Sequence, residues 1–273
     1  MSVSQATQFH PAVGVIGFGA FGRLIVRHLG PHMALRVYDP RPAEADSQTY
    51  GAVRTDLIAA ARCSVVILAV PVSRLSDVVA DIAPHLRSGT LVVDVGSVKM
   101  IPVEIMRAGL PAGVEILGTH PLFGPQCAVG GIAGLKIAVC PDTTGRHGRR
   151  AAAFLRTVLK LKVIVTTPEA HDREAAAVQG LTHLIARVLV AMEPLPTHMT
   201  TRSFSLLMQA VDMVRHDAPE VFEAIERSNP FAADVRQRFF KLAAQVEADL
   251  ARRNLSAAVE QPPLMTARTS AGP

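Results

Sequence analysis

The 273-residue sequence carries 28 Lys and Arg against 23 Asp and Glu, and 49% of its residues are hydrophobic. Its basic residues are scattered and not interleaved with aromatic ones, so a surface that attracts anionic metabolites is favoured over one that binds nucleic acid. The longest apolar run, Val65 to Val72, has about eight residues against the roughly 20 that a bilayer crossing needs, so we expect no membrane span.

The polar N-terminal stretch lacks the pattern of a secretory signal, which predicts a cytoplasmic protein. The length of the chain favours two domains. Its cysteines, Cys63, Cys127 and Cys140, are odd in number and lack the spacing of metal ligands. A reducing compartment keeps such thiols free. We therefore interpret them as packing residues and expect no metal site.

Apolar runs and segments of helical periodicity alternate over roughly the first 165 residues, which is typical of an α/β fold with a doubly wound, mostly parallel sheet. The expected strands are Ala12–Ile16, Leu35–Tyr38, Ser64–Val70, Thr90–Val95, Val114–Leu117, Lys136–Val139 and Lys162–Val165. The expected helices between them are Ala20–Leu29, Leu75–Leu86, Met100–Arg107 and His147–Leu159.

No strand pattern returns after Thr167, and Pro168 suits the first turn of a helix. The sequence thus predicts an α/β domain over residues 12–167 and an all-helical domain over residues 168–254. The expected helices of the second domain are Pro168–Met192, Thr201–Arg215, Pro219–Arg227 and Phe231–Arg253. Residues 255–273 have no periodicity and are expected to form a disordered tail.

A glycine-rich segment, Gly17-Phe18-Gly19-Ala20-Phe21-Gly22, joins the first expected strand to the first helix. In dinucleotide-binding folds the first glycine makes a tight turn, the second admits the pyrophosphate and the third lets the helix pack closely on its strand. The helix N-terminus then attracts the phosphates. An ordinary glycine-rich turn is the alternative. The strand–turn–helix context predicts a Rossmann-type domain in which this whole segment binds the cofactor.

Asp39 follows the second expected strand about 20 residues further on, where a carboxylate accepts the ribose hydroxyls of NAD and repels the extra phosphate of NADP. NAD is therefore the expected cofactor, although Arg41 could hold that phosphate in an NADP-binding alternative. Ala69, Val70 and Pro71 end a buried strand at the edge of the sheet where such cofactors bind, and are expected to wall the cofactor. Pro71 could equally serve only to end the strand.

Two later strand ends offer candidates for chemistry. Ser97 and Lys99 are expected to face the same crevice, although Ser97 could instead cap the following helix. His120 lies in a loop after the next strand. A histidine is neutral near pH 7 and can accept the proton of a reacting hydroxyl, whereas Lys99 would need a large lowering of its pKa. We predict that His120 is the general base; a structural histidine is the alternative.

Three polar residues of the long helix, Gln179, His183 and Arg187, share one face at positions i, i+4 and i+8. Buried polar groups need partners, and arginine suits carboxylates. The stripe is therefore expected either to face the crevice and an anionic ligand or to run along solvent. His171, at the start of the same helix, is interpreted as a surface residue.

From about Val13 to Val246 the sequence resembles the prephenate and arogenate dehydrogenase family. The motifs that carry the resemblance are Gly14-Val15-Ile16-Gly17-Phe18-Gly19, Asp94-Val95-Gly96-Ser97-Val98-Lys99, His120-Pro121-Leu122-Phe123-Gly124-Pro125 and Glu169-Ala170-His171-Asp172. The resemblance implies a Rossmann-type domain, a helical domain that forms a homodimer, and substrate held between them. It also implies NAD-dependent oxidative decarboxylation of prephenate to 4-hydroxyphenylpyruvate in tyrosine biosynthesis, with arogenate dehydrogenase as the alternative.

The resemblance further implies that His120 binds the ring hydroxyl and that Ser97 assists near the nicotinamide. The expected substrate-binding residues are Ser97, His120, Gln126, Gln179, His183 and Arg187. Gln126 stands at a position that is acidic in several relatives, and Met213 stands where some prephenate-specific members carry an arginine. Arg187 or Arg215 would then hold the side-chain carboxylate, or arogenate would be preferred.

Two other functions compete with this interpretation. A small β-hydroxyacid dehydrogenase couples similar domains but would use a lysine in the helical domain, where this sequence has His183 and Arg187. A nucleotide-sensing protein without turnover is the second alternative, because a fold does not determine an activity.

Overall fold

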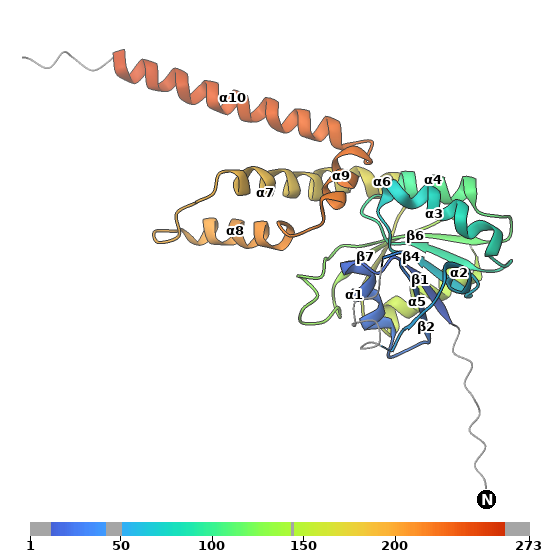
Figure 1. The fold of residues 1–273 in the computed structure, drawn as a ribbon. Helices are drawn as coiled ribbons and strands as arrows, with labels where there is room; N and C mark the ends of the chain where they lie inside the picture. The colour runs from blue at the N-terminus through green and yellow to red at the C-terminus, as the bar shows by residue number, and fades with distance from the viewer. Residues whose placement is uncertain (1–11, 42–50, 143–144, 260–273) are drawn as a thin grey trace, which may run out of the picture.

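The structure is a computed structural model that describes residues 12–41, 51–142 and 145–259. Its centre is a mixed sheet of eight strands in the order β3-β2-β1-β4-β5-β6-β7-β8, in which only the β6–β7 pair is antiparallel (Figure 1). The strands are β1 (Val13–Ile16), β2 (Leu35–Tyr38), β3 (Val53–Arg54), β4 (Val65–Leu68), β5 (Leu91–Asp94), β6 (Glu115–Pro121), β7 (Lys136–Pro141) and β8 (Lys162–Val165). The predicted α/β fold with a mostly parallel sheet is confirmed.

Helices cover both faces of this sheet, because its central strands are apolar on both sides. One face packs against α1 (Ala20–Leu29) and α5 (Arg146–Thr157), and its core includes Leu24 and Phe154. The other face packs against three helices, α2 (Leu57–Ala61), α3 (Leu75–Ile82) and α4 (Met100–Gly109). Short 3-10 turns, η2 (Val72–Arg74) and η3 (Ala83–His85), flank α3.

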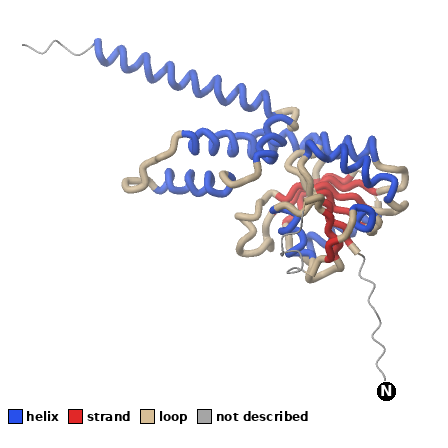
Figure 2. The backbone as a smooth tube through the Cα atoms, viewed as in Figure 1, coloured by secondary structure: helices blue, strands red, loops and turns tan. Residues whose placement is uncertain are grey.

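After β8 the described chain is helical and projects away from the sheet (Figure 2). The elements are α6 (Pro168–Ala175), a π-helical turn η4 (Ala176–Gly180), α7 (Leu181–Ala191), α8 (Arg202–Val214), α9 (Pro219–Arg227) and α10 (Ala232–Val259). The helices α7 and α8 lie side by side, and α10 leaves the η4 and α9 region as a long single helix (Figure 1). The predicted long helix is thus one continuous run with a π turn inside it.

Sequence patterns missed only the shortest elements. The strand β3 has two residues and α2 has five, which is too short for a periodic pattern to appear. The N-cap of α2 is Asp56, whose side chain accepts the backbone N–H of Ala59 at 2.7 Å. At the other end, α10 continues to Val259, so the expected tail boundary at residue 255 is wrong; residues 260–273 lie outside the described part.

One described helix, Pro168–Ala191, is long and apolar enough in composition to cross a membrane. Its apolar runs are short, because polar residues such as Gln179, His183 and Arg187 interrupt them every few positions. Two further polar residues, His171 and Asp172, are buried and form hydrogen bonds to the α/β part of the chain. This helix therefore connects the sheet to the remaining helices.

Candidate active site

The glycine-rich turn has the geometry that a phosphate-binding turn requires. Gly17 has a φ of +98°, and a side chain there would collide with the carbonyl oxygen of Ala69. A side chain at Gly22 would collide with the carbonyl oxygen of Gly17, so this glycine lets α1 pack onto the turn. At Gly19, the N-cap of α1, a Cβ would meet, among the described residues, the Arg41 guanidinium at 3.8 Å. No described backbone atom therefore crowds Gly19 at the helix N-terminus.

The remaining side chains of this segment point elsewhere. Phe18 is buried in the core that α1 and α5 share, and Phe21 is packed against the same core. Ala20 is exposed at the first turn of α1. Any contact of Phe18 or Phe21 with a cofactor must therefore come from the backbone, which sequence alone does not distinguish from a side-chain contact.

Asp39 ends β2 beside the turn and is almost fully engaged by the protein. One carboxylate oxygen accepts the Phe18 N–H at 2.7 Å and a guanidinium N–H of Arg41 at 3.2 Å. The other accepts the backbone and Nε hydrogens of Arg41 at 2.9 and 3.1 Å. Burial raises the pKa of Asp39, but these hydrogen bonds outweigh it and lower the pKa to about 2. Arg41 therefore covers the carboxylate that was expected to bind ribose.

The carboxyl ends of β1 and β4 lie beside this turn, where Gly17 approaches Ala69. The strand order changes direction between these two parallel strands: β2 and β3 lie on the far side of β1, and β5 lies on the far side of β4. Such a switch point is where doubly wound sheets bind ligands. Ala69, Val70 and Pro71 lie there, and Pro71 is exposed as the N-cap of η2.

Ser97 and Lys99 follow β5 but differ in placement. Lys99 is fully buried and its ammonium contacts the carboxylate of Asp94, so the expectation that Lys99 faces the crevice is wrong. Burial lowers the pKa of Lys99 to about 7, against the nearby negative charge of Asp172. Ser97 is half-buried and does not cap α4, whose N-cap is Lys99. Within the described chain its hydroxyl is not committed to capping.

His120 ends a row of three polar residues that joins the two parts of the chain. It is 5% exposed, and its Nδ1 lies 2.9 Å from Nε2 of His171. Nδ1 of His171 lies 2.7 Å from Oδ1 of Asp172. The Asp172 carboxylate also accepts the backbone N–H groups of Lys99 at 2.7 Å and Met100 at 2.8 Å, so it caps α4. The interpretation of His171 as a surface residue is wrong.

Burial lowers the pKa of His120 well below its usual value, with further lowering by the charges of His171, Lys99 and His183. A neutral imidazole in this position can accept a proton at physiological pH. His120 is thus a candidate base. It lies near the carboxyl end of β6, next to His171 of the helical part.

The polar stripe divides into different environments. His183 is buried, with Nδ1 2.9 Å from the Gln179 carbonyl oxygen and Nε2 3.2 Å from a carboxylate oxygen of Asp217. The side-chain oxygens of Gln179 and Gln126 are buried without a hydrogen-bond partner among the described residues. Arg187 is exposed and stacks over the Phe222 ring at 4.4 Å. Of the three stripe residues, only His183 is shown to lie near His120, through its effect on the His120 pKa.

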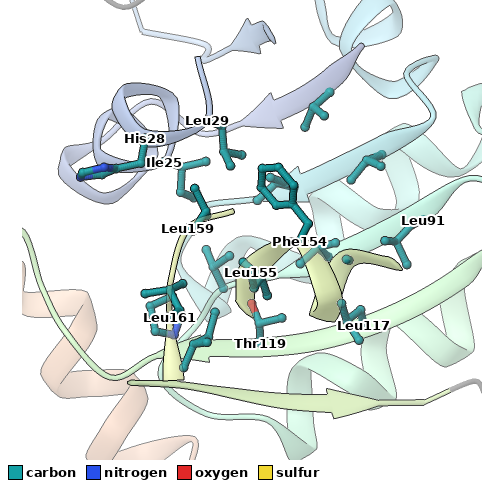
Figure 3. Close-up of a pocket in the computed structure, with 18 of the residues that line it drawn as sticks. Ile25, His28, Leu29, Leu91, Leu117, Thr119, Phe154, Leu155, Leu159 and Leu161 are labelled. Atoms are coloured by element: carbon teal, nitrogen blue, oxygen red, sulfur yellow. The ribbon is translucent and has the colours of Figure 1, made fainter. Parts of the chain in front are cut away.

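A large hollow lies on the opposite face of the sheet, between α1 and α5. Its volume is about 560 Å³ and its walls are almost entirely apolar. Figure 3 shows Ile25 and Leu29 of α1 gathered with Phe154 of α5 above the strand residue Thr119. Since side chains alternate along a strand, Thr119 faces the hollow and the neighbouring His120 faces away from it. Gly17, Ser97 and His120 do not line the hollow, so it is not the candidate site.

Comparison with known proteins identifies the family. The family model "Prephenate dehydrogenase, nucleotide-binding domain" matches residues 22–161, which is half of the chain. The chain belongs to the prephenate dehydrogenase family. The matched range contains Asp39, Ser97 and His120 but begins after Gly19.

Individual relatives agree with this assignment. The chain is 31% identical over 193 residues to a "Probable arogenate/prephenate dehydrogenase" of Methanocaldococcus jannaschii, which covers 66% of this chain and 42% of that protein. It is 29% identical over 238 residues to "Arogenate dehydrogenase 2, chloroplastic" of Arabidopsis thaliana, covering 83% and 66%. The chain therefore spans only about two fifths to two thirds of the length of these relatives.

Among solved structures, prephenate dehydrogenase from A. aeolicus in complex with hydroxyphenyl propionate and NAD+ has the same fold, with a TM-score of 0.71 and 20% identity. The match covers 93% of this chain and 95% of that one, so it includes the helical part.

Sequence reasoning overlooked the residues behind His120. His171 and Asp172 lie 51 and 52 positions from His120, and nothing in their periodicity predicts a contact. The signal was their occurrence as an adjacent His–Asp pair in the first turn of the long helix. No cluster of three His, Cys, Asp or Glu residues that could hold a metal occurs in the described part of the chain. Of the cysteines, Cys63 and Cys140 are buried as packing residues, but Cys127 is exposed.

Proposed function

We propose that the protein is an NAD-dependent dehydrogenase that converts prephenate to 4-hydroxyphenylpyruvate by oxidative decarboxylation. The observation that carries this proposal is His120, a buried imidazole held neutral by its surroundings at the edge of a nucleotide-binding sheet. Membership of the family supports the reaction class. In this proposal residues 12–167 bind the cofactor, and residues 168–254 form the substrate and dimerisation domain.

The turn after β1 fits a dinucleotide. The described backbone leaves Gly19 uncrowded at the N-terminus of α1, which suits a pyrophosphate, and the close contact of Gly17 with Ala69 sets the turn. Asp39 would bind the ribose, and Ala69 to Pro71 would wall the nicotinamide side. Because Arg41 lies over both Asp39 and Gly19, it would have to move for a ribose to bind Asp39, or else pair with a phosphate. NADP therefore remains the alternative cofactor.

The hydroxyl-bearing ring carbon would lose a hydride, for which bound NAD would supply the acceptor. His120 accepts the hydroxyl proton through its Nε2 as the carbon–oxygen bond gains double-bond character. The bond to the ring carboxylate then breaks, carbon dioxide leaves, and its electron pair makes the ring aromatic. The oxygen takes the proton back from His120. Ser97, which does not cap α4, would bind near the reacting hydroxyl.

Arogenate is the alternative substrate, and it would give tyrosine directly. Near His183 the described chain offers acceptors, the Asp217 carboxylate and the side-chain oxygen of Gln126, which both approach Gly124. Arg215, which is close to Asp217 in sequence, is engaged elsewhere, since it pairs with Glu193 at 2.5 Å and with Asp212 at 3.0 Å. Acceptors suit the ammonium group of arogenate, so both acids must be compared.

Initial rates with each acid and each cofactor test the proposal. We expect reduced NAD to form with at least one acid, and the ratio of kcat/KM values to name the substrate. A protein that binds NAD but turns over neither acid contradicts the proposal and favours the nucleotide-sensing alternative.

We also propose that the protein forms a homodimer through its helices. Large apolar side chains are exposed along this part of one chain, more than isolated surface residues would explain. They are Val188, Met192, Leu206, Leu207, Met213, Phe240, Leu242, Val246 and Leu250. A second copy would cover them by supplying the same surface around a twofold axis.

A further inference from the structure

We propose that His171 and Asp172 are positioning residues that hold His120 in the one tautomer that can act as a base. This inference rests on the proposed function for its catalytic consequence, whereas the tautomer itself is a property of the folded chain. The two residues come from α6, and His120 comes from β6. The helix thus completes a site that the sheet alone does not contain.

The direction of the hydrogen bonds follows from Asp172. Its carboxylate oxygens accept the N–H groups of Lys99 and Met100, so Asp172 is an acceptor throughout. Nδ1 of His171, 2.7 Å from that carboxylate, must therefore carry a hydrogen. In a neutral ring this leaves Nε2 of His171 as an acceptor, and Nδ1 of His120 must donate to it across 2.9 Å.

This arrangement determines the state of Nε2, the other ring nitrogen of His120. Since Nδ1 holds the hydrogen of the neutral ring, Nε2 keeps its lone pair, as a base requires. Within the described chain the His120 ring hydrogen-bonds only to His171, so Nε2 is available to a ligand. If Asp172 were unable to accept, the hydrogen bonds between the same three side chains could reverse and place the hydrogen on Nε2 of His120.

Charge around this row favours the same arrangement. Asp172 faces the positive charge that develops when His120 takes a proton and shares it with His171. The Lys99 ammonium contacts Asp94, whereas the Asp172 carboxylate contacts His171 and the two backbone N–H groups that it caps. The titratable and charged groups that face the row from the packed elements are Asp94, Lys99, Cys140 and His183.

A second His–carboxylate pair in the same fold provides a matched control. Glu115 begins β6, accepts the backbone N–H groups of His147 and Gly148 at the start of α5, and lies 2.8 Å from Nδ1 of His147. Its chemistry matches that of Asp172 and His171, including the helix cap. It lies at the opposite end of β6 from His120. Loss of this pair therefore reports the cost of a helix cap without any effect on the base.

The decisive variants are Asp172→Asn and His171→Gln. The asparagine amide can donate to Nδ1 of His171 and reverse the row, so kcat should fall by about 100 to 10,000-fold. A glutamine at 171 can still accept from His120, so we expect it to keep more activity than His171→Leu. The control Glu115→Gln should keep wild-type kcat. Affinity for NAD, measured without substrate, should stay unchanged in all four.

The pH profile separates positioning from simple structural support. His171→Leu removes a neighbour that both accepts the Nδ1 hydrogen of His120 and lowers the His120 pKa, so the acid limb of kcat moves along the pH axis. A merely structural role would lower kcat by the same factor at every pH.

Nitrogen-15 spectra of histidine-labelled protein test the tautomer without turnover. We expect the His120 signal, assigned by its loss in His120→Asn, to show a protonated Nδ1 and a bare Nε2, and to reverse in Asp172→Asn. A protonated Nε2 in the wild type, or wild-type kcat in Asp172→Asn, overturns the inference. If the wild type turns over neither acid while the spectra agree, the proposed function fails and the tautomer assignment stands.

Discussion

The chain up to α6 and the helices beyond α6 differ in how far their large side chains are buried. In the sheet, its covering helices and α6, most apolar residues lie in two cores, and buried polar groups such as Lys99 and Asp172 have partners within the chain. In α7, α8 and α10 large apolar residues face outward, including Leu206 and Phe240. The first region is complete in the sense that it holds both cores, although Val53 and Val129 are exposed there. The second region is incomplete in one chain, which fits the proposed dimer. Chemistry that depends on exact placement is found in the first.

The largest effect is expected from the complete region. His120→Asn keeps a polar side chain but removes the base, so kcat should fall by about 100 to 10,000-fold. Steady-state rates on the better of the two acids measure this, and NAD affinity serves as the control for folding. Full turnover by the variant would remove His120 from the mechanism.

The incomplete region should respond in its assembly state. Leu206→Glu places a charge on an exposed apolar position, 49% exposed in one chain, and should convert a dimer into monomers. Val53→Glu is the matched control, because Val53 is 65% exposed but lies on β3 of the sheet. Light scattering after size exclusion gives the masses. A wild-type monomer, or equal masses for both variants, would contradict the proposed interface.

Alanine substitutions at two glycines separate the cost of backbone strain from the cost of a steric clash in the turn. Gly17 and Gly89 have φ angles of +98° and +84°, so alanine costs about 1–2 kcal/mol of left-handed strain at either position. Only at Gly17 does the new methyl group also meet a backbone carbonyl, that of Ala69, which adds roughly 1–3 kcal/mol. Urea unfolding should rank Gly17→Ala below Gly89→Ala, and NAD binding should weaken only in the former. Equal losses would show that the turn can relax.

The pH dependence follows from the buried position of His120. A lone exposed histidine would titrate near 6.5, but burial and the charges of His171, Lys99 and His183 lower the pKa of His120 well below that value. The base is active when neutral, so activity should be level near neutral pH and fall only as pH decreases through the lowered pKa. A kcat profile across acidic pH tests this. An acid limb at or above pH 6.5 would mean that His120 is more hydrated than the structure indicates.

The smallest effect is expected at Arg187, on α7 of the second region. If Arg187 binds the substrate carboxylate, Arg187→Ala raises KM more than it lowers kcat. If its role is only to stack on Phe222, the variant loses about 0.5–1 kcal/mol of stability and KM stays unchanged. Measuring both quantities distinguishes a residue of the site from one of the surface.

Periodicity and local turn chemistry were sufficient to predict the sheet and most helices. The strand at Leu35–Tyr38 and the helices at Ala20–Leu29 and Pro219–Arg227 were predicted at their observed bounds. These elements have strong local signals, a continuous apolar run or a regular apolar face with a proline at the start. Errors occurred where an element was very short, as at β3, or where the helix pattern faded, as at residue 255.

By itself the sequence determined the alternation of strands and helices, the glycine turn and the candidacy of His120, because each is encoded by neighbouring residues. Only the tertiary structure decided that Lys99 is buried against Asp94, that Arg41 covers Asp39, and that His171 and Asp172 stand behind His120. Such contacts join residues distant in sequence, and their direction depends on how α6 packs against the start of α4. Hydrogen bonds need placement within a few tenths of an ångström, which no local pattern specifies.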